Sequence, residues 1–127
     1  SAVILSKGCV DVYNPKTVRS TMGSLFHIPI VKTEDSLKTL EYLKQRDIKI
    51  ISSELGAKRY YFEVNMKRGI VIVIGNEANG VSKEVSEMSD YQVKIPMCGG
   101  AESLNAGIAS GILMYEAVRQ RLEKTFL

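Results

Sequence analysis

The chain has 127 residues, of which 45% are hydrophobic, and its 17 Lys and Arg against 14 Asp and Glu give a formal net charge of +3. This length and apolar content suit one compact domain with a buried core. The longest apolar run, residues 69–75, is far shorter than the roughly 20 residues of a membrane-spanning helix, and no basic-then-apolar leader opens the chain. We therefore expect a soluble, cytoplasmic protein whose mild positive charge permits a polyanionic partner.

Two cysteines and one histidine are too few for a structural zinc site or a disulfide framework. We expect free thiols at Cys9 and Cys98 and no bound metal. The basic residues come in small groups, such as Lys58 with Arg59, and form no long run. A solvated surface explains these groups as well as a nucleic-acid contact does.

Five short apolar runs predict strands, at residues 2–5, 28–31, 48–51, 70–74 and 91–95. Helical patterns separate them. This alternation is typical of an α/β domain with a mainly parallel sheet flanked by helices. We find no internal repeat and no linker, so we expect residues 1–127 to form a single domain.

Capping residues indicate where the first three helices begin. Asn14 followed by Pro15 starts one helix, which Gly23 can end. Thr33 is the expected cap of a second helix that runs to residue 46, and Ser82 is the expected cap of a shorter third one. The apolar residues of the second helix recur every three positions, at Leu37, Leu40 and Leu43.

The longest predicted helix spans residues 103–124. Its apolar residues form one helical stripe, at Leu104, Ile108, Ile112, Tyr115, Val118 and Leu122. Five small residues lie in its first half, Ala106, Gly107, Ala109, Ser110 and Gly111. An interior glycine costs about 1 kcal/mol relative to alanine in a helix, so we expect another segment to approach this half closely.

Ligands of parallel α/β sheets bind at the carboxyl ends of the strands, where three segments carry candidate residues. Ser53 follows the third strand, residues 75–80 follow the fourth, and residues 96–105 follow the fifth. Residues 75–80 lack the glycine spacing of a dinucleotide site and the Gly-Lys-Ser/Thr of a P-loop, which disfavours a phosphate cradle. In the last segment Ser103 and Asn105 can both reach a ligand. A helix cap is the alternative role of Ser103, whereas Asn105 in the first turn has no structural role.

Two motifs resemble those of the SpoU (TrmH) family of RNA ribose methyltransferases. The run IVIGNEANGVS at residues 72–82 resembles the family's second motif, an apolar strand followed by Gly-x-Glu-x-x-Gly, an apolar residue and Ser. Residues 93–97 (VKIPM), 103–105 (SLN) and Ala109 resemble its third motif. Residues 11–23 are similar to the middle region of the family, so the resemblance runs in order along nearly the whole chain.

The resemblance implies a SPOUT fold with a carboxyl-terminal trefoil knot, a homodimer, and S-adenosylmethionine as cofactor for methylating a ribose 2′-hydroxyl in rRNA or tRNA. The small-residue helix would then meet neighbouring backbone inside the knot or at the dimer contact. The implied cofactor-binding residues are Ser53, Gly75, Asn76, Glu77, Ile95, Pro96, Met97, Ser103, Leu104 and Asn105. The implied catalytic residues are Glu77, Ser103 and Asn105, and Arg19 is assigned to RNA contact.

The family's first motif, an asparagine followed later by an arginine implicated in activating the 2′-hydroxyl, would precede Ala2. We therefore expect these residues to be a catalytic-domain fragment without that motif or an amino-terminal RNA-binding domain. One hypothesis is that the fragment binds cofactor and is catalytically inactive. The competing interpretation is a non-catalytic, dimeric RNA-binding module, which a cofactor titration separates from an enzyme. A flavodoxin-type nucleotide-binding domain is disfavoured because the phosphate-binding glycines are missing.

Overall fold

The computed structural model describes residues 1–126, and the side chains up to residue 123. Its chain forms two compact units, Ser1–Glu41 and Tyr42–Leu127, where the sequence predicts one domain. Along the described part of the chain, every helix is too short or too polar to cross a membrane. Each unit is described separately below.

The first unit is built on a pair of parallel strands, β1 (Val3–Leu5) and β2 (Ile30–Lys32). Between them lie α1 (Pro15–Ser20) and the short 3-10 helix η1 (Ser24–Phe26). The predicted start of α1 is confirmed, because Asn14 Oδ1 accepts a hydrogen bond from Lys16 N at 2.9 Å. Gly23 separates the two helices at φ 85°, a conformation that favours glycine.

The helix α2 (Ser36–Lys44) begins later than the sequence predicts, and the predicted cap is wrong. Asp35 Oδ1, not Thr33, accepts the backbone hydrogen bond of the first turn, from Lys38 N at 3.1 Å. Thr33 instead stabilises the turn before the helix, where its hydroxyl accepts from Asp35 N at 3.2 Å. A carboxylate at this place also interacts favourably with the positive end of the helix dipole.

The second unit holds a four-stranded sheet in the order β4-β6-β3-β5, and every strand pair in it is parallel. The strands are β3 (Lys49–Ser53), β4 (Arg59–Tyr60), β5 (Ile70–Ile74) and β6 (Tyr91–Lys94). The predicted α/β class with parallel strands is therefore confirmed. The sequence does not predict β4, because two residues are too few to show a strand pattern.

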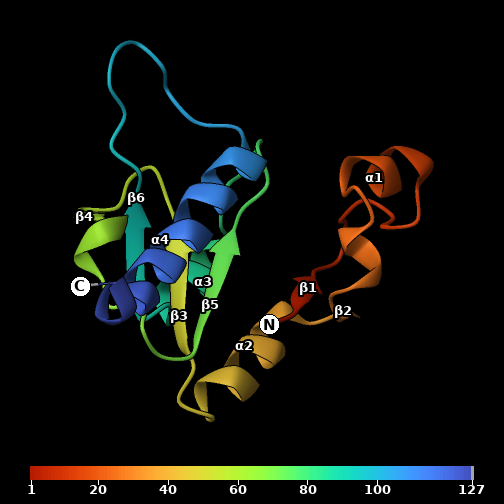
Figure 1. Cartoon of the computed structure of the whole chain (residues 1–127), viewed down its shortest axis with the longest axis horizontal. Helices are drawn as coiled ribbons and strands as arrows, with labels where there is room; N and C mark the ends of the chain where they lie inside the picture. Colours follow the sequence, from red (N-terminus) through yellow and green to blue (C-terminus); the bar gives the residue numbers. More distant parts are fainter. Residues whose placement is uncertain (127) are drawn as a thin grey trace. The chain divides into compact units, whose positions relative to one another are not determined.

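Helices flank this sheet on both faces (Figure 1). The helix α4 (Ala106–Phe126) crosses one face, and α3 (Lys83–Met88) covers the other. A second 3-10 helix, η2 (Tyr61–Glu63), joins β4 to the segment before β5. The predicted Ser82 cap of α3 is confirmed by a hydrogen bond from Val85 N to Ser82 Oγ at 3.3 Å.

The core of this unit lies between the sheet and α4. Alternate strand residues reach it, so Ile51 of β3 and Val93 of β6 are both fully buried against Leu113 of α4. Burying a side chain of this size stabilises the fold by about 1.5–3 kcal/mol. The buried core cluster consists of Ile51, Val64, Met66, Val93, Leu113 and Ala117.

The apolar stripe predicted for the last helix is not the face that α4 buries. The buried face carries Leu113 and Ala117, together with the polar Glu116 and Gln120. By contrast, the predicted stripe is largely exposed, and Tyr115 is 72% exposed. Hydrophobic periodicity located the helix correctly but indicated the wrong side, because α4 has apolar residues on two faces.

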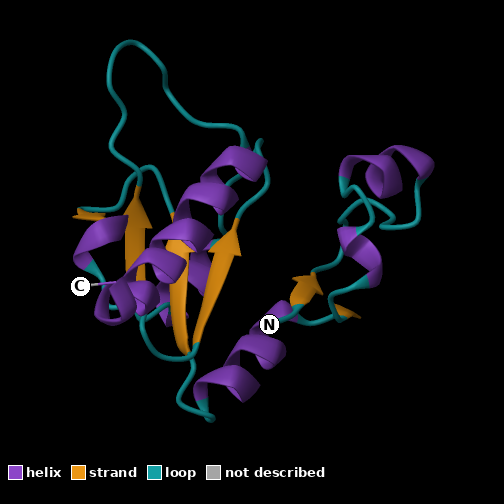
Figure 2. Ribbon diagram, viewed as in Figure 1, coloured by secondary structure: helices purple, strands orange, loops and turns teal. Residues whose placement is uncertain are grey.

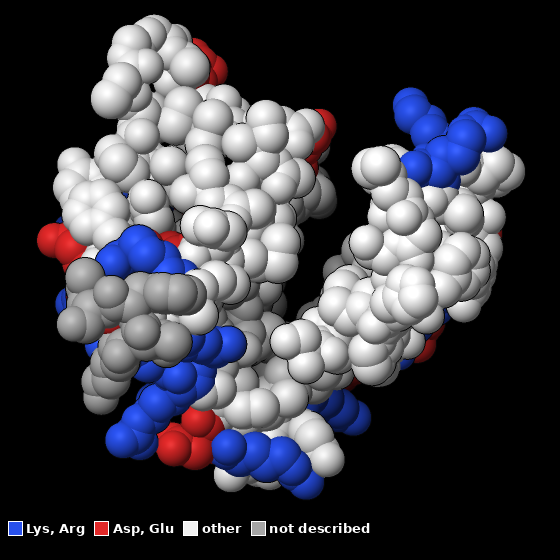
Figure 3. All heavy atoms as spheres, in the orientation of Figure 1, with Lys and Arg blue, Asp and Glu red and all other residues white. Residues whose placement is uncertain are grey.

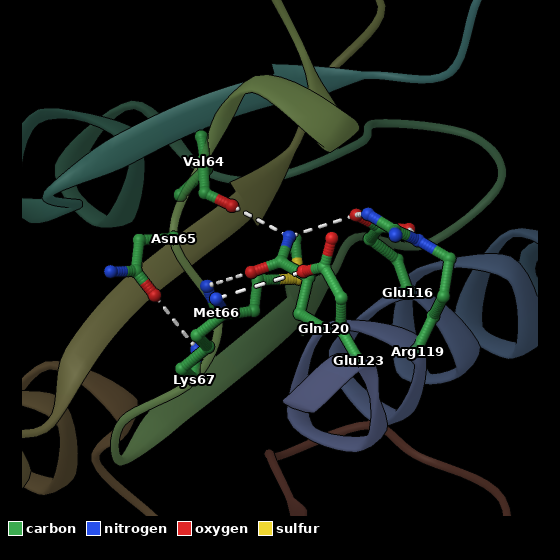
Figure 4. Close-up of polar contacts among 8 residues, drawn as sticks. All are labelled: Val64, Asn65, Met66, Lys67, Glu116, Arg119, Gln120 and Glu123. Carbon is green, nitrogen blue, oxygen red and sulfur yellow. Dashed lines mark hydrogen bonds and ion pairs between the residues drawn. The ribbon is translucent and has the colours of Figure 1, made fainter. Parts of the chain in front are cut away.

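Polar side chains of α4 form hydrogen bonds with the segment that leads into β5 (Figure 4). Gln120, 7% exposed, donates from Nε2 to Val64 O at 2.9 Å, and its Oε1 accepts from Met66 N at 2.8 Å. The same Nε2 donates to Glu116 Oε1 at 2.8 Å. Glu116 in turn accepts two hydrogen bonds from Arg119, at 2.8 and 2.9 Å. We call Glu116, Arg119 and Gln120 the α4 clasp.

The α4 clasp predicts a loss of stability in acid. The hydrogen bond from Arg119 lowers the pKa of Glu116 below its ordinary value of 4.5, although burial acts in the opposite direction. A carboxyl group whose pKa is lowered by folding stabilises the protein above its unfolded pKa, and this contribution disappears as the pH falls through the folded pKa. We expect Glu116→Gln to be less stable than the parent at pH 7 and the difference to shrink at pH 3, as measured by urea unfolding.

The control is Glu87→Gln, which replaces an exposed carboxylate on α3. It should change the unfolding free energy by less than about 0.5 kcal/mol at either pH. A Glu116→Gln difference of the same size at pH 7 and pH 3 would show that the Glu116 charge contributes nothing.

Candidate active site

Three strands of the second unit end side by side at one edge of the sheet. The register pairs Ser53 of β3 with Ile74 of β5 and with Val93 of β6. Their arrows point the same way in Figure 2, so the loops after them leave from the same edge. The structure thus brings together the three segments in which the sequence places the candidate site, as expected for a parallel α/β sheet.

The loop after β5 is a tight turn that requires its glycines. A Cβ on Gly75 would overlap the backbone of Gly80 and Val81, and Gly80 itself has φ 65°. Asn76 closes the turn, because its backbone oxygen accepts from Gly80 N at 2.9 Å and its Oδ1 accepts from Asn79 N at 2.6 Å. The Asn76 side chain therefore has a structural role, in addition to any contact with a ligand.

Glu77, at the tip of this turn, is fully available to a ligand. Its side chain is exposed and forms no hydrogen bond or ion pair with the residues that the structure describes. A carboxylate in this position can accept a hydrogen bond or a proton from a hydroxyl group of a substrate.

The loop after β6, residues 95–105, is a long excursion without helix or strand (Figure 2). Ile95, Met97 and Leu104 are half-buried, whereas Pro96 and Ser103 are exposed. Within the described chain, residues 96–104 make no hydrogen bond to one another or to other residues. Their backbone donors and acceptors are consequently free to bind a ligand such as a purine base.

Asn105 is the cap of α4, a role that the sequence offered to Ser103 as an alternative and not to Asn105. Its Oδ1 accepts hydrogen bonds from Gly107 N at 2.8 Å and Ile108 N at 3.3 Å. The helix begins at Ala106, three residues later than predicted, and Ser103 lies outside it. Because Oδ1 is engaged at the helix end, the Nδ2 amino group is the part of Asn105 that can reach a ligand, and it can only donate.

The predicted site residues from Ser53 to Asn105 all lie in the second unit, Ser53 as the last residue of β3 and the others on the loops after β5 and β6. Arg19 does not belong with them. It is an exposed residue in the last turn of α1, in the first unit. Its assignment to RNA contact therefore stays a prediction that the structure leaves untested.

Glu54 is a residue at this edge that the sequence prediction missed. Its carboxylate accepts hydrogen bonds from Ser52 Oγ at 2.5 Å and from Ser86 Oγ of α3 at 2.9 Å. Gln92 of β6 donates to the same Ser86 hydroxyl at 3.0 Å. These contacts tie α3 to the ends of β3 and β6 beside Ser53. The signal available in the sequence was the run of Ser52, Ser53 and Glu54 directly after the predicted strand at residues 48–51.

The loops after β5 and β6 carry acidic but no basic side chains. Glu77 lies on the loop after β5 and Glu102 on the loop after β6, and neither loop contains Lys or Arg. On the face drawn in Figure 3, the loop after β6 is almost free of charge apart from one acidic patch. In the described residues no cluster of His, Cys, Asp and Glu is suited to hold a metal ion, and Cys9 and Cys98 are free.

Comparison with known proteins places this fold and these loops in a family. The SpoU rRNA Methylase family matches residues 1–115, which span most of the chain and both compact units. The chain therefore belongs to the SpoU rRNA Methylase family. The resemblance found in the sequence motifs is confirmed.

Two curated relatives show the range of named activities. A 23S rRNA (uridine(2479)-2'-O)-methyltransferase of Streptomyces viridochromogenes is 35% identical over 125 residues, covering 94% of this chain and 44% of the relative. The 23S rRNA (guanosine(2553)-2'-O)-methyltransferase RlmP of Bacillus subtilis is 36% identical, covering 90% of this chain and 46% of the relative. The chain thus spans about half the length of the curated relatives that it matches.

Solved structures agree with this assignment. The SpoU methyltransferase AviRb of Streptomyces viridochromogenes in complex with the cofactor AdoMet matches with a TM-score of 0.88 and 35% identity, covering 96% of this chain and 50% of that chain. The TrmH/SpoU tRNA modifying enzyme of A. aeolicus matches with a TM-score of 0.83 and 35% identity, covering 97% and 64%. The α/β architecture of this chain is therefore that of SpoU methyltransferases.

Proposed function

We propose that this chain is the catalytic domain of an RNA methyltransferase that binds S-adenosylmethionine and methylates a ribose 2′-hydroxyl of rRNA or tRNA. The observation that carries the proposal is the convergence of Ser53, the Gly75–Gly80 turn and residues 95–105 at one edge of a parallel sheet. Family membership and the AdoMet complex of a protein 35% identical to this chain support it. The cytoplasmic location expected from the sequence stays a prediction.

The residues at this edge fit an adenosine-containing cofactor. Half-buried Ile95, Met97 and Leu104 offer apolar surface to a purine ring, and the unpaired backbone groups between them offer donors and acceptors. Gly75 has no room for a side chain beside the backbone of Gly80 and Val81, so the turn after β5 is tight. When bound, S-adenosylmethionine would supply an electrophilic methyl group on a positively charged sulfur.

Polar residues of the site would orient the ribose and support loss of the hydroxyl proton. Asn105 caps the amino end of α4 with Oδ1, which leaves Nδ2 as a donor for a ligand where the helix dipole also favours negative charge. It is therefore suited to hold a ribose oxygen, and it cannot act as the base. Glu77 is suited to accept a hydrogen bond from the hydroxyl that reacts. We propose that Ser103, which is exposed on the same loop as Asn105, lies near both Asn105 and Glu77.

Holding the two reacting groups in line would supply a large part of the rate. Well-oriented reactants gain roughly 7–11 kcal/mol over reactants that meet in solution. The network of Glu54, Ser52 and Ser86 stiffens the edge on which the loops are mounted, because it joins β3 to α3. Such stiffness favours positioning of the ribose within a fraction of an ångström.

We further propose a homodimer and a knotted carboxyl-terminal segment. On α4, Ile108 is 57%, Met114 56% and Tyr115 72% exposed, an apolar face that a second copy would cover. A side chain at Gly111 of the same helix would meet open space. No contact among the described residues therefore requires a glycine at this position. The knotted segment is proposed from the membership of the chain in its family.

A non-catalytic, dimeric RNA-binding module is the alternative function. The presence of the Gly-x-Glu turn at residues 75–77 together with Ser103, Leu104 and Asn105 argues against it, because a module that only binds RNA does not need these cofactor-binding segments. Cofactor binding decides between the two.

Calorimetry with S-adenosylmethionine and its demethylated product tests the proposal. We expect binding in the micromolar range, about −8 kcal/mol. Gly75→Ala should weaken binding at least tenfold, because the new Cβ forces the turn of Gly80 and Val81 to move. Gly56→Ala is the matched control, because a Cβ at Gly56 meets open space, and its affinity should equal that of the parent.

Thermal unfolding of each variant accompanies the titrations. Absence of binding heat at millimolar ligand by a chain that melts cooperatively would refute the cofactor proposal and favour the RNA-binding module. Equal affinity of the two glycine variants would show that the turn after β5 does not touch the cofactor.

A further inference from the structure

A cluster of exposed aromatic and basic side chains lies on the edge strand β4 and its neighbour β6. The rings of Tyr60 and Phe62 are stacked, with centroids 5.4 Å apart and planes at 23°. They are 37% and 49% exposed, large values for rings of this size. Lys94 Nζ lies 5.3 Å from the Tyr60 ring centroid, and the strand register pairs these two residues. We call Lys58, Tyr60, Phe62 and Lys94 the β4 patch.

The charges around the β4 patch favour an anionic partner. Lys58 is exposed, whereas Arg59 extends over the Tyr91 ring at 5.6 Å on the opposite face of the sheet and is not part of the patch. The two acidic side chains nearby accept hydrogen bonds from other residues of the fold. Glu63 accepts from Tyr60 N at 2.7 Å, and Glu54 accepts from the Ser52 and Ser86 hydroxyls. Exposed rings with adjoining cations are the features with which proteins hold unpaired nucleotides, by stacking on bases and attracting phosphates.

The position of the β4 patch links it to the candidate active site. Lys94 is the last residue of β6 and directly precedes Ile95 and the loop proposed to bind cofactor. That loop and the one after β5 contain no Lys or Arg, so neither offers a cation to the phosphates of an RNA. The β4 patch offers cations on the neighbouring surface of the same unit.

We propose that the β4 patch binds single-stranded RNA next to the nucleotide to be methylated, with Tyr60 and Phe62 stacking on one or two bases and Lys94 and Lys58 contacting phosphates. This inference rests on the proposed function for its substrate class. It names the place where the RNA substrate enters the site, and it predicts that the RNA near the target is unpaired.

Fluorescence anisotropy with a labelled single-stranded RNA of twelve mixed-sequence nucleotides tests the proposal. Phe62→Leu combined with Tyr60→Leu keeps apolar surface and removes the stacking faces, and we expect about tenfold weaker binding or more. Lys94→Gln should weaken binding and lower the slope of log affinity against log salt by about one. Lys94→Arg should restore both. The controls are Tyr42→Leu and Lys38→Gln, exposed residues of α2, which should bind as the parent does.

Circular dichroism confirms the fold of each variant, and sedimentation and S-adenosylmethionine calorimetry are run on the same samples. Parent-like RNA affinity of the folded patch variants would overturn the inference, as would a parent chain that does not bind the RNA. If the patch variants lose dimerisation and keep RNA affinity, the patch is a protein contact and the inference is also wrong. Failure of the proposed function is separate, because it appears as a lack of cofactor binding by the parent.

Discussion

Asn105→Ala is expected to lower methyl transfer about 100-fold in a protein that contains this chain and the rest of its active site. Loss of one oriented hydrogen-bond donor in an active site typically lowers the rate by about this factor. The variant also removes the cap of α4, because Asn105 Oδ1 accepts from Gly107 N and Ile108 N. Loss of such a cap costs about 1 kcal/mol of stability. The sequence indicated no structural role for Asn105. The expected loss of stability is therefore predicted from the structure alone.

Asn105→Asp separates the two roles of this residue. A carboxylate still accepts the two backbone hydrogen bonds, and its charge suits the amino end of a helix. We therefore expect parent-like thermal unfolding together with a loss of methyl transfer similar to that of Asn105→Ala, since the Nδ2 donor is gone. Full activity of Asn105→Asp would show that Asn105 serves only as a cap and that its assignment to the active site is wrong.

Gln120→Ala is expected to destabilise the second unit by about 2–4 kcal/mol. The change leaves Met66 N and Val64 O without their partner, and a buried polar group that loses its hydrogen bond costs about 1–3 kcal/mol. It also removes a hydrogen bond to Glu116 in the α4 clasp. Urea unfolding followed by circular dichroism should show a lower midpoint with an unchanged slope.

The control for this change is Gln45→Ala, which removes the same functional group from an exposed position just after α2. It should alter the unfolding free energy by less than about 0.5 kcal/mol. Similar midpoints for Gln120→Ala and Gln45→Ala would mean that water replaces the lost hydrogen bonds and that the α4 clasp does not hold the helix in place.

Local signals in the sequence predicted most of the elements. The run at residues 70–74 matches β5 to the residue, and Asn14 and Ser82 cap α1 and α3 as expected. Such signals act within a few residues, so they can be read without knowing the fold. Where two polar residues lie close together, the same reasoning selected the wrong cap at Thr33 in place of Asp35, and it offered the cap of α4 to Ser103 and not to Asn105. Which of two neighbours caps a helix depends on the path of the preceding loop.

The sequence by itself determined the family and the segments that form the candidate site, because their glycines and polar residues follow predicted strands in a parallel α/β order. Only the tertiary structure decided which face of α4 is buried, since Leu113 and Ile112 are both apolar and the sheet packs against Leu113. It also decided which atoms of Asn105 remain for a ligand, and it brought Tyr60 beside Lys94, residues 34 positions apart that pair only across two strands. Contacts of this kind depend on strand order and register, which periodicity along one strand does not encode.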